Sequence, residues 1–238
     1  RHGGEALMRC FSADFATIAL FAIGMSVYGA VEASLQQFFR SVIPFMSASF
    51  ATGQGHGVHQ GLRTVTGLLT TLAAWGFLGM LFLGRHLVPW VMGPAYAGLA
   101  PVLTLFSALV LLVIPGLAGV AVAISRERAG LYLAAAALRL ALFACLAPAL
   151  TVRYGALGAA AAALGAGIGF SILYMLAARR EAPFPYQPAL LNLLLVFPLS
   201  LPAAFPLAPV PATAALAGVL LIHATLAVRL RPAMRRAW

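Results

Sequence analysis

Hydrophobic and polar positions divide the chain into about seven long apolar segments separated by short polar connections. Most of the segments have the roughly 20 residues that an α-helix needs to cross the hydrocarbon core of a bilayer. We therefore predict an all-α fold, a polytopic transmembrane helical bundle with about seven spans. The predicted spans are residues 13–43, 62–83, 100–124, 129–151, 156–178, 189–205 and 212–228.

Prolines, glycines and charges mark where these spans end or bend. Pro44 is expected to end or kink the first span, and Pro115 to bend the third, because proline removes a backbone hydrogen bond. Residues 51–61 are predicted to form a Gly- and His-containing loop, and residues 89–96 a turn with aromatic residues at the membrane interface. Further short connections are expected at residues 125–128 and 153–155.

The fifth span is rich in alanine and glycine, and residues 165–169 have the sequence GAGIG. Small residues at this spacing allow the backbones of two membrane helices to approach closely. We therefore predict a close helix contact along this segment.

Composition supports a membrane protein. Of the 238 residues, 63% are hydrophobic and only 8% are charged, with a mean hydropathy of +0.99, whereas about a quarter of the residues of a soluble domain are charged. The net charge is +10, and every basic residue is arginine. These arginines lie mostly at the ends of the apolar segments, which favours contact with anionic membrane lipids over nucleic acid.

The arginines also predict the orientation of the chain, because cytoplasmic loops carry an excess of positive charge. With seven spans, the N-terminal side has only Arg1, Arg9, Arg85 and Arg153. The opposite side has Arg63, Arg126, Arg128, Arg179, Arg180, Arg229, Arg231, Arg235 and Arg236. We therefore predict a cytoplasmic C-terminus and a periplasmic or extracellular N-terminus. The odd number of spans suggests that a matching first half is missing.

A polar stripe on the first span is the leading candidate for a functional site. Glu32, Gln36 and Arg40 have a spacing of four residues, which places them on one face of a helix. Ionisable groups at membrane depth are costly and normally face the interior of a bundle or a watery cavity. The alternative is that Arg40 extends to the membrane interface with Glu32 as its local partner.

Arg139 is the second candidate, because it lies near the middle of the fourth span among apolar neighbours. A guanidinium there needs a cavity, a carboxylate or a phosphate. It is expected to pair with Glu32 across the bundle or to bind an anionic headgroup in a bidentate manner. The alternative is a purely structural ion pair between helices.

Other polar residues give no sign of enzyme chemistry. The five acidic residues are scattered, Cys10 and Cys145 are far apart, and His56 and His59 have no carboxylate or cysteine near them in the sequence. We therefore predict no catalytic site, cofactor or metal. Asn192 is expected to form hydrogen bonds between helices, and His223 to be a helix contact.

Three stretches carry a resemblance to a known family. They are RSVIPFMS at residues 40–47, VMGPAYAGLAPVL at 91–103 and YGALGAA at 154–160. In order and spacing, over about residues 11–180, they resemble the C-terminal half of polysaccharide or O-antigen flippases of the MATE-like (multidrug/oligosaccharidyl-lipid/polysaccharide) exporter superfamily. The resemblance implies one lobe of a two-lobed transporter, with residues 1–180 as its core and residues 181–238 as two additional spans and a basic tail.

The same resemblance implies a function. Family members move lipid-linked saccharides across the bacterial cytoplasmic membrane by alternating access through a cavity between two lobes. By this resemblance the cargo is a lipid-linked anionic saccharide and the partner is the missing N-terminal half. The choice of Glu32, Gln36, Arg40 and Arg139 as residues of the substrate cavity rests on the cost of polar groups at membrane depth and not on a family motif. A cation-coupled multidrug or small-molecule antiporter of the same superfamily is the alternative, with Glu32 as the only carboxylate at depth.

Overall fold

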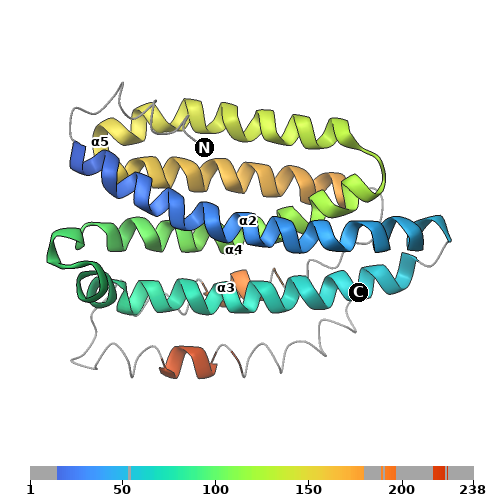
Figure 1. The fold of residues 1–238 in the computed structure, drawn as a ribbon, viewed down its shortest axis with the longest axis horizontal. Helices are drawn as coiled ribbons and strands as arrows, with labels where there is room; N and C mark the ends of the chain where they lie inside the picture. The colour runs from blue at the N-terminus through green and yellow to red at the C-terminus, as the bar shows by residue number, and fades with distance from the viewer. Residues whose placement is uncertain are drawn as a thin grey trace.

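The computed structural model describes residues 15–52, 55–179, 189, 191–196, 217–222 and 224. The described part of the chain is all-α, as predicted (Figure 1). Its elements are α2 (Phe15–Ala51), α3 (Gly55–Met92), the short 3₁₀ helix η1 (Pro94–Tyr96), α4 (Leu99–Ser125) and α5 (Ala129–Arg179).

Four helices of the described residues are long and apolar enough to cross a membrane, and not the seven predicted. One reason is that the predicted fourth and fifth spans are the two arms of one element, α5, which counts as a single helix among the four. The other is that most of the predicted sixth and seventh spans, with His223 and the basic tail, lies outside the described residues. The structure thus supports a multi-pass membrane protein with four candidate spans.

Helix α5 is folded back on itself at Gly155, where the predicted connection at residues 153–155 is found. The backbone of Gly155 has φ 57° and ψ −133°, which is not helical and strongly favours glycine. The two arms that it joins, residues 129–154 and 156–179, lie side by side (Figure 1). A Cβ atom on Gly165 or Gly169 would meet Leu146 or Leu142 of the other arm, so the close contact predicted from GAGIG is confirmed.

Helix α4 is the central helix of the fold. It packs against α2, α3 and α5, whereas α2 and α5 touch each other much less. Its sequence is almost wholly apolar, and 72% of its most hydrophobic 18-residue stretch is buried. The corresponding share is 11–33% for the other three candidate spans. The exposed apolar faces of those three helices suit a lipid environment.

Glycines allow the neighbours of α4 to approach it closely. A Cβ atom on Gly24 of α2 would lie 2.8 Å from the ring of Phe106 and 2.9 Å from Val102. On α4 itself, a Cβ atom on Gly116 would lie 2.9 Å from the hydroxyl of Ser171. Small residues at helix contacts, which allow two backbones to approach closely, are common in membrane helix bundles.

Several predicted helix ends are wrong. Pro44 does not end the first helix, because α2 continues to Ala51. Most of the predicted loop at residues 51–61 is helical, since α3 begins at Gly55, and α3 continues through Pro89 to Met92. Local composition did not predict these extensions, because a proline within a long helix is tolerated where neighbouring groups compensate for the lost hydrogen bond. The predicted charged connection at residues 125–128 is found between α4 and α5.

Asn192 has the structural role expected of it. Its amide nitrogen donates to the hydroxyl of Thr70 at 2.9 Å and to that of Thr71 at 3.0 Å, and it also lies 3.4 Å from the carbonyl oxygen of Gly67. Asn192 is buried, so these bonds attach the segment 191–196 to α3.

Candidate functional site

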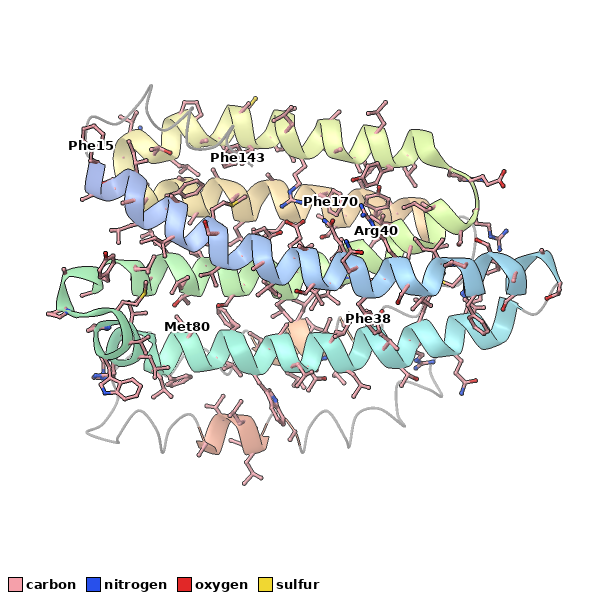
Figure 2. All side chains as sticks on the ribbon, viewed as in Figure 1. Phe15, Phe38, Arg40, Met80, Phe143 and Phe170 are labelled. Carbon is pink, nitrogen blue, oxygen red and sulfur yellow. The ribbon has the colours of Figure 1, made fainter. Side chains whose placement is uncertain are left out.

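The structure contains a cavity of about 580 Å³ walled by α2, α4 and both arms of α5. Arg40, Phe143 and Phe170, labelled in Figure 2, come from α2, the first arm and the second arm, respectively. Most of the lining is apolar. The polar residues of the wall are Tyr28, Glu32, Gln36, Arg40, Tyr132 and Arg139.

All four residues that the sequence singled out therefore line one cavity. Glu32, Gln36 and Arg40 project from the same side of α2, as their spacing predicted, and Arg139 comes from the first arm of α5. Their contact with a substrate stays a prediction.

Arg139 and Glu32 form an ion pair across the cavity. Nη1 of Arg139 donates to Oε1 of Glu32 at 2.8 Å, and Nη2 lies 3.5 Å from Oε2. The side chains of Glu32 and Arg139 are only 13% and 27% exposed. This arrangement allows the two charges to remain together in apolar surroundings, because each has its counter-ion at hydrogen-bonding distance.

Tyr28 completes this cluster. Its hydroxyl accepts a hydrogen bond of 3.0 Å from Nη2 of Arg139. The ring of Tyr28 is buried and stacks on Phe106 of α4 at 5.5 Å between centroids, so the hydroxyl has a fixed position. Phe170 lies on another side of the guanidinium, with its ring centre 5.5 Å from Cζ of Arg139, within the range of a cation–π contact.

Arg40 differs from Arg139, although both line the cavity. Within the described ranges, Arg40 has neither a hydrogen bond nor an ion pair, and Gln36, one helical turn away, has no hydrogen-bond partner there either. The side chain of Arg40 is exposed to the cavity and its surroundings. The N–H groups of Arg40 and the amide of Gln36 are thus available to a ligand.

Polar and apolar parts of the cavity follow one another along α2. Phe21 and Met25 line the part nearer the N-terminal end of the helix, and the polar residues begin at Tyr28 and continue to Arg40. Helix α4 contributes only apolar residues to the wall. The cavity is therefore amphipathic along its length, and it suits a ligand that is itself amphipathic.

The sequence analysis missed Tyr28 and Tyr132 as lining residues. The spacing in the sequence could have identified Tyr28, because it lies four residues before Glu32 and so extends the same stripe by one turn. No pattern in the sequence identifies Tyr132, because only the packing of the first arm of α5 against α2 and α4 brings it to the cavity.

The described residues contain no group of three or more His, Cys, Asp or Glu side chains arranged to hold a metal ion. Cys145 is a free, exposed thiol, and Cys10 lies outside the described residues. His59 lies against Phe50 near the α2–α3 connection and does not line the cavity.

No family model, curated protein or solved structure matches the chain.

Proposed function

We propose that this protein forms one lobe of a flippase that moves a lipid-linked oligosaccharide or polysaccharide precursor across the bacterial cytoplasmic membrane. In this proposal the lobe acts with a partner lobe, and the cavity walled by α2, α4 and α5 receives the polar part of the cargo. No covalent chemistry is required of the chain.

One observation carries the proposal: charged and amide side chains gather around an amphipathic cavity in a bundle of helices apolar enough to span a membrane. Charged residues at such positions normally mark the path of a substrate or an ion. The three family-like stretches at residues 40–47, 91–103 and 154–160 support a flippase among the possible transporters.

The ion pair between Glu32 and Arg139 favours a flippase over a cation-coupled antiporter. An antiporter of this kind needs a carboxylate available to Na⁺ or H⁺, and Glu32 is the only acidic residue in the described wall of the cavity. Its carboxylate is already paired with Arg139 at 2.8 Å. Arg40, in contrast, offers an unpaired positive charge, which suits an anionic cargo.

Arg40→Ala tests the proposal, because Arg40 has no partner among the described residues and its loss should leave the fold intact. We expect translocation of a fluorescent polyprenyl-linked saccharide to fall at least about tenfold, the scale of one charged hydrogen bond. The assay measures appearance of the fluorophore in the opposite leaflet of membrane vesicles from cells that make the full-length protein, with a membrane-impermeant quencher.

Arg153→Ala is the matched control. Arg153 is an exposed arginine beside the turn of α5 and does not line the cavity. We expect this variant to translocate at the wild-type rate. Equal rates for Arg40→Ala and wild type, at equal amounts of protein in the membrane, would contradict the proposed site.

A further inference from the structure

We infer that the cavity selects an amphiphile whose headgroup has a single negative charge, as in a phosphodiester, over one with two. The inference rests on the proposed function for its physiological setting only, because it concerns binding and not movement.

The first argument is the charge of the wall. The charged side chains that line the described cavity are Glu32, Arg40 and Arg139, one negative and two positive. Glu32 neutralises Arg139 through a contact of 2.8 Å, which leaves the charge of Arg40 without a counter-ion in the described wall. A headgroup with one negative charge completes the balance, whereas a second negative charge would remain uncompensated in mostly apolar surroundings.

The second argument is where the charges lie. The guanidinium of Arg139 is engaged by Glu32 and Tyr28, so a headgroup finds its free donors on Arg40 and Gln36. These residues are one helical turn apart on α2, and Glu32 is one turn further along the same face. A headgroup held by Arg40 and Gln36 therefore meets, one turn further on, the Glu32–Arg139 pair, which has no net charge and offers no counter-ion to a second negative charge.

The third argument is the apolar part of the wall. Beyond Tyr28 the cavity continues along α2 past Met25 to Phe21, and Phe143 of the first arm faces the same space. No charged group lines this part. It suits a hydrocarbon chain attached to the headgroup, so an amphiphile should bind better than the same headgroup alone.

Native mass spectrometry of the full-length protein in a neutral detergent tests the inference. The ligands are phosphatidylglycerol (one negative charge), phosphatidate (close to two at pH 8) and zwitterionic phosphatidylcholine, all with the same acyl chains. For the wild-type protein we expect phosphatidylglycerol to bind at least about tenfold more tightly than phosphatidylcholine, and more tightly than phosphatidate. Tighter binding of phosphatidate than of phosphatidylglycerol would overturn the inference.

Two variants test the charge balance. Glu32→Gln removes the negative charge of the wall, so we expect the preference to shift to phosphatidate. Arg40→Ala removes the uncompensated positive charge, and we expect the preference for phosphatidylglycerol over phosphatidylcholine to be lost. The second variant has no ion pair to break, so it tests the inference even if Glu32→Gln lowers the yield of folded protein. Retention of the preference by Arg40→Ala would overturn the inference.

Glu127→Gln and Arg153→Ala are the matched controls, since each makes the same change in total charge outside the cavity wall. Wild-type selectivity in both control variants supports the inference. A shift of preference toward phosphatidate in Glu127→Gln, equal to that in Glu32→Gln, would contradict it. Dimethyl phosphate, a free phosphodiester, separates headgroup from tail. Weak competition by dimethyl phosphate supports an amphiphile, whereas competition equal to that of phosphatidylglycerol would contradict a role for the apolar wall.

A failure of the binding inference can be distinguished from a failure of the proposed transport function. Selective binding of phosphatidylglycerol by a protein that moves no saccharide would contradict the proposed function and leave this inference standing. Saccharide translocation by a protein that binds phosphatidate more tightly than phosphatidylglycerol would contradict this inference and leave the proposed function standing.

Discussion

At the scale of single residues, two arginines of one cavity have different surroundings and therefore different roles. Arg139 is held by Glu32 and Tyr28 of α2 and by Phe170 of the second arm of α5, and its guanidinium has a fixed position. Arg40 has no such partners among the described residues. We expect Arg139 to contribute to the stability of the bundle and Arg40 mainly to ligand binding.

A double-mutant cycle on Glu32 and Arg139 measures this structural contribution. Removal of one partner leaves the other charge uncompensated, so we expect Glu32→Ala and Arg139→Ala each to lower the free energy of unfolding by about 3 kcal/mol. We expect the double variant to cost clearly less than the sum, because it leaves no uncompensated charge. The measurement is reversible unfolding in mixed detergent micelles. Additive single effects would show that the pair is not coupled.

At the scale of the elements, α4 organises the fold through its apolar surface and through glycines at its contacts. Gly24 of α2 lies directly against Phe106 and Val102 of α4, and both of these side chains are buried and cannot move aside easily. Gly79, in the middle of α3, has open space where a Cβ atom would be added. The two glycines thus occupy opposite environments in helices of similar length.

Substitution of alanine at these two glycines should have opposite effects. We expect Gly24→Ala to lower the free energy of unfolding by about 1–3 kcal/mol, because the new methyl group overpacks the α2–α4 contact. We expect Gly79→Ala to raise it by about 0.5–1 kcal/mol, because alanine favours the helix and meets no neighbour. Unfolding of the two variants in the same micelles checks this. A stabilising Gly24→Ala would mean that α2 and α4 are further apart than described.

At the scale of the whole molecule, the connections gather at two opposite ends of the bundle (Figure 1). Ser47 of α2 contacts Ser125 at one end, beside the charged α4–α5 connection. At the other end, Thr17 of α2 lies against Gly155 and Leu20 against Gly98. The α4–α5 connection contains Arg126 and Arg128, which favours the cytoplasmic side for that end.

Cysteine labelling tests this topology. In a protein whose Cys10 and Cys145 are replaced by serine, we expect Glu127→Cys and Tyr154→Cys to react with a membrane-impermeant maleimide from opposite sides of the membrane. Glu127 and Tyr154 are both exposed, so access within the protein does not limit the reaction. In right-side-out vesicles only Tyr154→Cys should be labelled. Labelling of both positions from one side would contradict a first arm of α5 that crosses the membrane.

Local pattern was sufficient for much of the fold and for part of the site. The apolar periodicity predicted an all-α protein, and residues 153–155 and GAGIG predicted the turn and the close contact of the α5 arms. Local pattern was not sufficient for helix ends. Pro44 and the glycines near residue 55 are helix-breaking by local preference, yet the helices extend past or begin at them.

The sequence by itself determined which residues share a face of one helix, because that depends only on the period of the helix. It placed Glu32, Gln36 and Arg40 on one stripe and showed that Arg139 needed a partner, since an isolated charge at membrane depth is too costly. Only the tertiary structure decided that Glu32 is this partner and that Arg40 remains unpaired in the described part of the chain. Such contacts join residues more than 100 positions apart in the sequence, and they depend on how α2 and the arms of α5 pack around α4.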